Sequence, residues 1–238
     1  MIASLVLALG LVMQSAPTTY VLRDGPGPLA LFVRAPVGAW VTYRLSGGPG
    51  RTAYWRIAVV SAGKGFEGRA KRWVELSFGI HPKLEAPLAQ LKVLVDERGL
   101  CRAVLAVGVA RPRELSKEGL SRVAHLPWLH ALSHLPGAAA TVEQGRRALL
   151  MTGGGAVTAL PLSFFSQGVV VEKVYLSREV PVLGLARLEL PGVEVMEADA
   201  WGMDAVASLQ IPESGVPLLH LRRDSGDDWP LPPFRRRP

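Results

Sequence analysis

Two histidines have a spacing that could bind a metal. His130 and His134 lie four residues apart in a segment rich in helix-forming residues, so a helix would place them on one face. Such a pair can contribute two ligands to a zinc site. No Asp, Glu or Cys lies between residues 119 and 142 to complete the site. The simpler interpretation is two partly exposed histidines, and we predict no metal site.

A glycine-rich segment, TGGGAV at residues 152–157, superficially resembles a phosphate-binding loop. It lacks the Lys-Ser/Thr pair of a P-loop and the strand–glycine–helix setting, so a turn is the simpler interpretation. No GxSxG, SxxK or HExxH motif occurs. A hydrolase site assembled from distant residues is left as an alternative.

Three carboxylates and one thiol complete the candidates. In an alternating strand, Glu197 and Asp199 would share a face and Glu194 would take the other. Paired carboxylates can act in glycoside hydrolysis, but a solvated strand face is the simpler interpretation. Cys101 is the single cysteine, which excludes an intramolecular disulfide, and its apolar run CRAVLAVGV predicts a buried core residue. We therefore predict no catalytic residue, no cofactor and a non-enzymatic protein.

The N-terminal end of the chain predicts export. Residues 2–13 are an uncharged apolar run, too short to span a bilayer, which needs about 20 apolar residues. We interpret residues 1–16 as a signal peptide, which places the mature chain in the periplasm or outside the cell. Residues 17–36, with the sequence GPGP, are expected to form a linker. No later stretch is long and apolar enough to be a membrane helix.

The net charge of +7 over 238 residues allows an anionic partner. The Lys and Arg residues are scattered through strand-like segments, and export argues against nucleic acid. An anionic membrane surface is the partner that remains, beside the plain interpretation that the charge serves solubility. In the tail, residues 213–238, Pro and charge predict disorder. Its Arg235, Arg236 and Arg237 beside Phe234 could touch anionic lipid or simply solubilise the chain end.

Alternating apolar and polar residues predict four strands, at residues 40–46, 54–61, 72–78 and 90–96. Glycine-rich turns between strands of this kind favour an antiparallel sheet with one buried face. Twelve residues would lie on that face, either packing a core or lining an apolar ligand-binding cleft. They are Val41, Tyr43, Leu45, Trp55, Ile57, Val59, Val74, Leu76, Phe78, Leu91, Val93 and Val95.

The middle of the chain changes character. Residues 112–137 contain helix formers and spaced apolar residues and end at Pro136-Gly137, which predicts a short helical insert. Its Leu126, Trp128, Leu129 and Leu132 could cover one mouth of the sheet. Residues 138–167 carry no clear pattern, and residues 168–177 return to strand-like alternation. Three further strand-like segments follow in residues 180–211.

Two short motifs carry a family resemblance. Residues 180–211 read VPVLGLARLELPGVEVMEADAWGMDAVASLQI, and Pro181 and Gly184 suit a corner at which strand pairing starts or bends. The matching positions are Gly38, Trp40, Tyr43 and Arg44 in the first strand, then Val180, Pro181, Gly184, Leu185 and Arg187 at the late corner. Leu183 stands where an aromatic residue is usual. Over residues 37–211 the sequence resembles the outer-membrane-lipoprotein-sorting-like (LolA/LolB-like) superfamily, in particular its uncharacterised exported bacterial members.

The resemblance implies a fold and a function. The expected fold is mainly β (α+β): a curved antiparallel half-barrel sheet over residues 37–212, with a short helical insert covering the concave face. The expected function is binding of a lipid or lipoprotein acyl chain in the apolar concavity, where each buried CH₂ contributes about 0.8 kcal/mol. The twelve inward residues would form the ligand-binding face. The alternatives are a structural or protein-interaction module with a filled core, and a hydrolase.

Overall fold

The computed structural model describes residues 32–46, 52–63, 70–96, 99–117, 119–120, 141–190, 194–211 and 217–219. The expected signal peptide, the histidine pair and the four apolar residues expected to cover the sheet lie outside these ranges, as does most of the basic tail.

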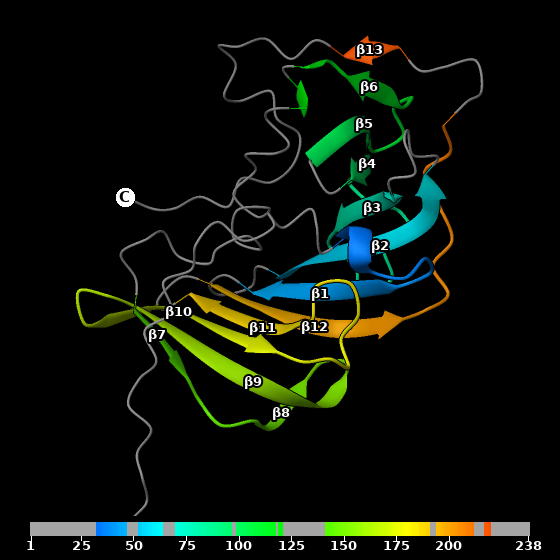
Figure 1. Cartoon of the computed structure of the whole chain (residues 1–238). Helices are drawn as coiled ribbons and strands as arrows, with labels where there is room; N and C mark the ends of the chain where they lie inside the picture. Colours follow the sequence, from blue (N-terminus) through cyan, green and yellow to red (C-terminus); the bar gives the residue numbers. More distant parts are fainter. Residues whose placement is uncertain are drawn as a thin grey trace, which may run out of the picture.

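The described residues form one open, curved and mainly antiparallel sheet, which confirms the predicted mainly β fold (Figure 1). Its strands are β1 (Trp40–Ser46), β2 (Thr52–Gly63), β3 (Lys71–Gly79), β4 (Ala89–Asp96), β5 (Gly99–Val107), β6 (Arg113–Leu115), β7 (Thr141–Gln144), β8 (Ala148–Thr152), β9 (Gly155–Ser166), β10 (Val169–Leu176), β11 (Leu185–Leu190), β12 (Glu194–Gly202) and β13 (Leu218–Leu219). The order across the sheet is β13-β6-β5-β4-β3-β2-β1-β12-β11-β10-β9-β7, and β8 also pairs with β9.

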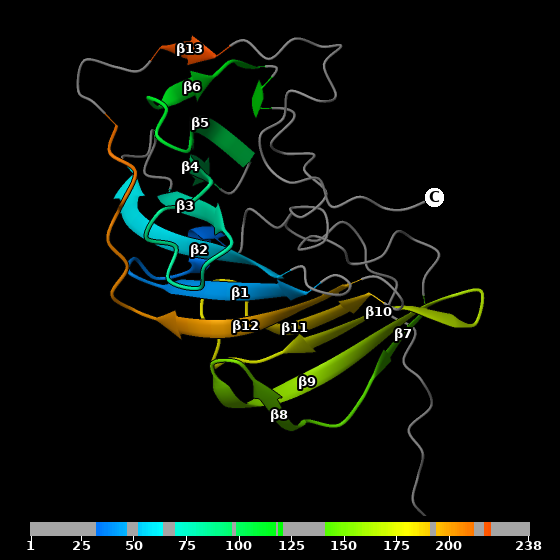
Figure 2. The same cartoon turned by 180° about the vertical axis from the view of Figure 1, so that it is seen from behind.

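The sheet consists of two meanders that meet at its centre. Strands β1 to β6 are neighbours in sequence order, and so are β9 to β12. They join where β1 pairs with β12, from Trp40 opposite Gly202 to Ser46 opposite Val195. Figures 1 and 2 show the first meander rising from β1 and the second passing below it, so that the sheet bends around one concave side.

The predicted alternation fixes the register of the first meander. Ile57 lies opposite Leu76, and Leu76 lies opposite Leu91 on the next strand. Directly opposed residues point to the same face of a sheet. The apolar side chains of β1 to β4 therefore lie together on one face, as the sequence predicts. We call this the concave face.

The opposite face of the first meander is also buried, which differs from the predicted sheet with one buried face. Residues 204–211 follow β12 and belong to the last of the three strand-like segments expected in residues 180–211. They form an irregular strap across this convex side. Ala205 and Leu209 of the strap are buried, against Ala58 and Val60 in one cluster and against Val104 and Ala106 in another. Strands β2 to β5 are thus covered on both faces, by the strap on the convex side and by the main core on the concave side.

A buried carboxylate fastens the strap to the sheet. Glu75 accepts hydrogen bonds from the backbone N–H groups of Ser208 (3.0 Å) and Leu209 (3.0 Å), and from the Ser208 hydroxyl. Nearby, Lys92 Nζ donates to the Leu209 carbonyl over 2.8 Å and lies 5.9 Å from the centre of the Trp73 ring. These bonds satisfy polar groups that would otherwise be buried without partners.

Three segments differ from expectation at the borders of the domain. Residues 32–34, in the expected linker, form a helical turn, and Phe32 and Val33 are buried in the main core. At the start of the expected helical insert, residues 113–115 form strand β6, and residues 117, 119 and 120 are helical as predicted. Within the tail expected to be disordered, Leu218–Leu219 form β13, which pairs in parallel with β6. These short segments are held by the burial of single side chains and by a few backbone hydrogen bonds. A segment of two or three residues is too short to show a periodic pattern in the sequence.

The glycine-rich segment is a turn, as predicted. Gly153 and Gly154 connect β8 to β9, and Gly155 has a φ of 127°, a conformation that favours glycine. Both turn glycines lie against β12, where a Cβ at Gly153 would overlap Asp199 and one at Gly154 would overlap the Trp201 ring. The late corner is also confirmed, because residues 177–184 connect β10 to β11 and Gly184 has a φ of 66°.

The outer edge of the second meander is a strand in two pieces. Both β7 and β8 pair with β9, and residues 145–147 separate them. The break faces Pro161 of β9, whose nitrogen cannot donate a hydrogen bond. Only the Pro161 carbonyl is used there, accepting from Gly145 N over 2.9 Å. Pro161 thus accounts for the interruption in this edge.

Candidate functional site

The structure brings the twelve predicted residues together on the concave face. Eleven of them are at most 2% exposed, and Leu45 is partly buried against the same cluster. Three aromatic rings form their centre: the Trp55 ring lies 6.0 Å from the Tyr43 ring and stacks at 5.5 Å on the Phe78 ring. Phe32 is fully buried in the same cluster. The role of these twelve residues in ligand binding stays a prediction.

Tyr43 shows how completely this part is filled. Its hydroxyl donates a hydrogen bond to the Leu185 carbonyl over 3.2 Å, reaching from the first meander to the second. Burial raises the pKa of Tyr43 far above its ordinary value. The ring is therefore a neutral packing element of the core.

The concave face continues across the second meander. Leu45 lies opposite Met196, Met196 opposite Leu188, Leu188 opposite Val174, and Val174 opposite Leu162. This row crosses β1, β12, β11, β10 and β9 with apolar side chains alone. The face that packs the core in β1 to β5 is thus continuous with the inner side of β9 to β12.

The inner side of the second meander is less completely filled. Four of its apolar residues are half-buried, in contrast to the eleven buried ones of the first meander. They are Leu160, Leu162, Val174 and Leu190, and we call them the half-buried patch. Their common orientation follows from the register of β9 to β12. Apolar side chains that are only partly covered can gain further burial by contact with a ligand.

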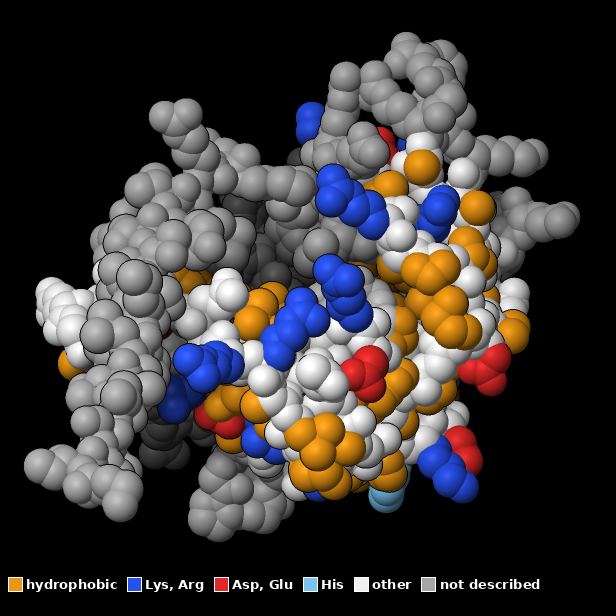
Figure 3. All heavy atoms as spheres, turned by 60° about the horizontal axis from the view of Figure 1, so that its bottom comes forward, with side chains coloured by type: hydrophobic (Ala, Val, Ile, Leu, Met, Phe, Trp, Pro, Cys, Tyr) orange, Lys and Arg blue, Asp and Glu red, His pale blue; other side chains and the backbone are white. Residues whose placement is uncertain are grey.

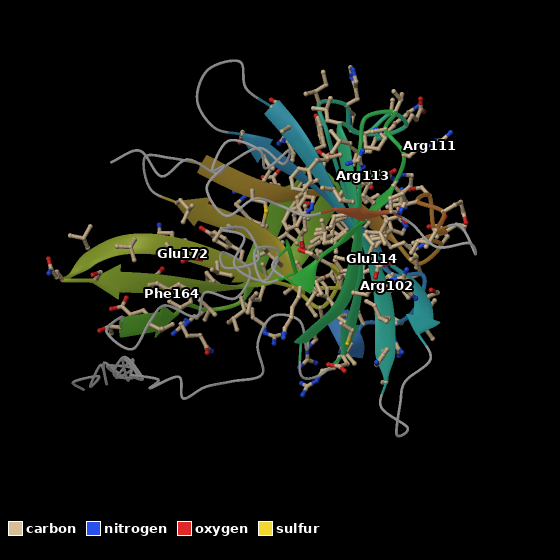
Figure 4. All side chains as sticks on the ribbon, turned by 90° about the horizontal axis from the view of Figure 1, so that it is seen from above. Arg102, Arg111, Arg113, Glu114, Phe164 and Glu172 are labelled. Atoms are coloured by element: carbon tan, nitrogen blue, oxygen red, sulfur yellow. The ribbon has the colours of Figure 1, made fainter. Side chains whose placement is uncertain are left out.

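A carboxyl group lies beside the half-buried patch. Glu172 of β10 is directly opposite Phe164 of β9, and Phe164 is directly opposite Val142 of β7. Phe164 and Val142 are both buried. Figure 4 shows Phe164 and Glu172 on this arm of the sheet, away from the arm of β5 and β6. Glu172 is itself 8% exposed, and its Oε1 has no hydrogen-bond partner.

The sequence contains a signal for Glu172 that the pattern analysis did not use. In the strand-like run GVVVEKVYLS, Glu172 stands two positions before Val174, so simple alternation places both on the apolar face. A charged residue in an apolar stripe is a candidate functional residue. Nothing in the sequence shows whether such a side chain finds a partner.

Glu197 and Asp199 of β12 do not form an acid–base pair. Glu197 is buried rather than solvated, which corrects the sequence interpretation, and it accepts hydrogen bonds from Arg44 (3.0 Å), from Arg187 and from Gly153 N (2.9 Å). A β-bulge inserts Asp199 between the residues opposite Thr42 and Tyr43, which breaks the alternation assumed for it. Two arginines and a turn thus hold Glu197 in a structural role.

The prediction for Cys101 is wrong, because this residue is exposed. The register between β4 and β5 shifts here: Leu94 is opposite Arg102 and Val95 is opposite Leu100, so Cys101 has no opposing residue. An extra residue in one strand turns its side chain away from the regular alternation. Partial desolvation of the thiol and the neighbouring Asp96 together raise the pKa of Cys101.

The described residues contain no group of three or more His, Cys, Asp or Glu side chains arranged to hold a metal ion. Among the same residues, we find no helix with the length and apolar character that a membrane span requires.

Basic and apolar side chains alternate on the surface. Figure 3 shows apolar patches interspersed with Lys and Arg side chains on the lower face. At the β5–β6 edge, Arg102 makes two hydrogen bonds to the Glu114 carboxylate, at 2.8 and 2.7 Å. Arg111 and Arg113 nearby (Figure 4) are exposed. Val109 is exposed as well.

Comparison with solved structures finds proteins whose backbone arrangement is similar to that of this chain. MucB matches with 11% identity and a TM-score of 0.43 over 80% of this chain, which spans 62% of the MucB chain. A domain described as an outer membrane lipoprotein-sorting protein from Vibrio parahaemolyticus matches with 10% identity and a TM-score of 0.32, covering 72% of this chain and 86% of the domain.

A protein of YmcC-like fold described as exported, from Bacteroides fragilis, matches with 10% identity and a TM-score of 0.33, covering 73% of this chain and 99% of that protein. A domain described as lipoprotein-sorting is thus among the structures to which this chain is similar. At these identities and TM-scores, no residue role transfers to this chain. No protein-family model matches the sequence, and no curated protein matches it.

Proposed function

We propose that the protein is an exported, non-enzymatic binding module that holds an alkyl chain, such as the acyl chain of a lipid or lipoprotein, against the half-buried patch. The observation that supports this is the contrast along one continuous apolar face. In β1 to β4 eleven residues of the face are buried in a core, whereas on β9 to β11 the four residues of the half-buried patch are only partly covered, beside buried residues such as Leu188 and Phe164. An alkyl chain laid along these strands would bury more of them, at about 0.8 kcal/mol per CH₂.

The twelve predicted residues then have a supporting role in this proposal. Their packing holds β1 in place, and β1 positions β12 and the strands beyond it. The ligand contacts residues such as Leu162 and Val174, and the buried core around Trp55 forms the end of the concavity. Deeper insertion between Tyr43 and Phe78 would require displacing rings that are already in contact.

The test is uptake of the neutral apolar probe N-phenyl-1-naphthylamine by the purified mature chain, with native mass spectrometry of any lipid that co-purifies. We expect saturable uptake, weakened about tenfold by Leu162→Asn, because replacing an apolar contact costs about 1.4 kcal/mol or more. The matched control is Leu149→Asn on β8, where the leucine is 72% exposed. Absence of uptake, or equal weakening by both substitutions, would refute the proposal.

A second candidate function is a protein-interaction module with a filled core. It is favoured by the packing of Tyr43 and Phe78 on either side of Trp55 in the first meander. A chain that purifies without lipid and takes up no alkyl probe would support it. An anionic membrane surface is a further partner to test, and the exposed Arg111 and Arg113 beside Val109 are the residues to substitute. Vesicle sedimentation with and without anionic lipid measures this directly.

A further inference from the structure

Glu172 differs from the other buried glutamates among the described residues. Glu75 and Glu197 are similarly buried, and each accepts several hydrogen bonds, from the strap and from two arginines respectively. Glu172 is 8% exposed, yet its Oε1 accepts none. A buried carboxyl oxygen without a partner loses its hydration and gains no hydrogen bond in return. Such a group in a native structure calls for a partner that is not part of the fold.

The residue directly opposite Glu172 on β9 and the residue beyond it on β7 are apolar. Phe164 lies directly opposite on β9, with Val142 beyond it on β7. The neighbouring charged residues, Glu143 of β7 and Lys173 of β10, point to the other face of the sheet because of the alternation along each strand. On β11 the charged residues Arg187 and Glu189 lie opposite Tyr175 and Lys173, and so share that other face.

No charged group therefore compensates Glu172 from within the described residues. Burial alone raises the pKa of Glu172, to about 7. The carboxyl is thus close to half-ionised near neutral pH, and a cation brought next to it would favour the ionised form.

We propose that Glu172 is the polar anchor of the concave face and receives the primary ammonium group of a ligand whose alkyl chain lies along the half-buried patch. This inference rests on the proposed function and specifies its ligand class. An ammonium group offers three N–H donors and a positive charge, which match an unpartnered carboxylate. An anionic head group would meet a like charge in an apolar setting, where repulsion is strong.

The experiment compares three twelve-carbon compounds that differ only in the head group: dodecylamine, dodecanol and dodecanoate. Each displaces the neutral apolar probe N-phenyl-1-naphthylamine from the mature chain, at pH 6 and at pH 8. At pH 8 we expect dodecylamine to bind about tenfold more tightly than dodecanol, and dodecanoate to bind most weakly. At pH 6 the preference for the amine should shrink, because Glu172 is then mostly protonated.

Two variants locate the effect. Glu172→Gln should abolish both the preference for the amine and its pH dependence. The control Glu143→Gln, at an exposed residue on the other face of β7, should retain both. An unchanged preference in Glu172→Gln, or dodecanoate binding as tightly as dodecylamine at pH 8, overturns the inference.

The same data separate this inference from the proposed function. If the neutral probe and dodecanol bind but the amine has no advantage, the alkyl-binding function stands and the role of Glu172 is refuted. If no compound binds, both are refuted. A final arm compares dodecylamine with a lysophosphatidylethanolamine of the same chain length, which distinguishes a free amine from an amine carried on a lipid head group.

Discussion

Replacing Glu172 by Gln should make the stability of the folded protein less dependent on pH. The folded protein binds the Glu172 proton with a pKa of about 7, whereas the ordinary value is 4.5. Between these values the folded state keeps a proton that the unfolded chain releases. The stability that this group contributes is therefore fully present below pH 4.5 and is lost as the pH rises to about 7.

The size of the loss follows from the two pKa values. Each tenfold change in proton affinity corresponds to about 1.4 kcal/mol, which sets an upper bound of about 3 kcal/mol at pH 8. Part of the carboxyl lies near solvent, which screens the penalty, so we expect about half of this, roughly 1.5 kcal/mol. Glutamine keeps the shape of the side chain and has no charge to desolvate.

Urea unfolding at pH 5 and at pH 8 measures the effect. The stability of Glu172→Gln relative to the wild type should rise by about 1 kcal/mol or more between pH 5 and pH 8, a midpoint shift of about 0.5 M. The comparison between two pH values removes any constant effect of the new amide. Glu143→Gln is the control and should show no such change. A relative stability that stays constant with pH would refute the burial and isolation of Glu172.

Three further predictions concern the architecture. Phe32→Ala should lower the free energy of unfolding in urea by about 3–5 kcal/mol because the ring is fully buried. The control Val37→Ala, at a 46% exposed residue, should lower it by less than about 0.5 kcal/mol. Equal losses would contradict the inclusion of Phe32 in the core. Glu75→Gln should lower stability by about 2 kcal/mol and speed hydrogen exchange at the Leu209 amide, since charge-assisted bonds to the strap are lost. Cys101 should react completely with a thiol reagent in the native protein, as an exposed side chain does; modification only after denaturation would place it in the core instead.

The strands of the first meander could be predicted from the sequence because alternation is a local property. Val41, Ile57 and Leu76 each sit in a run with period two, and burial on one face needs no more than that. The late corner could be predicted for a similar reason, since Gly184 adopts a positive φ that few other residues tolerate. Both signals depend on a few neighbouring residues.

The features that were missed depend on distant partners. The strap around Ser208 has the composition of a strand, and only the Glu75 carboxylate, 133 residues earlier in the chain, shows where it goes. Phe32 lies in a short apolar run, LALFV, that has no period-two alternation, and its burial comes from packing against the core of the sheet. Cys101 and Asp199 were misplaced by bulges, which shift the register by one residue. Glu172 lies on the face that alternation indicates, but its isolation is a property of the assembled sheet.

The junction of β1 with β12 has a consequence for biosynthesis. The first meander can form as soon as β6 has been synthesised, but the free edge of β1 waits for β12, whose pairing runs from Val195 to Gly202. The 87 residues from the end of β6 to the end of β12 take roughly 4 to 17 s at about 5–20 residues per second, and the edge stays unpaired for that time. An open strand edge can pair with another copy of the chain. We therefore expect chaperones that suppress aggregation to act on the β1 edge of the nascent chain, during the interval before the second meander arrives.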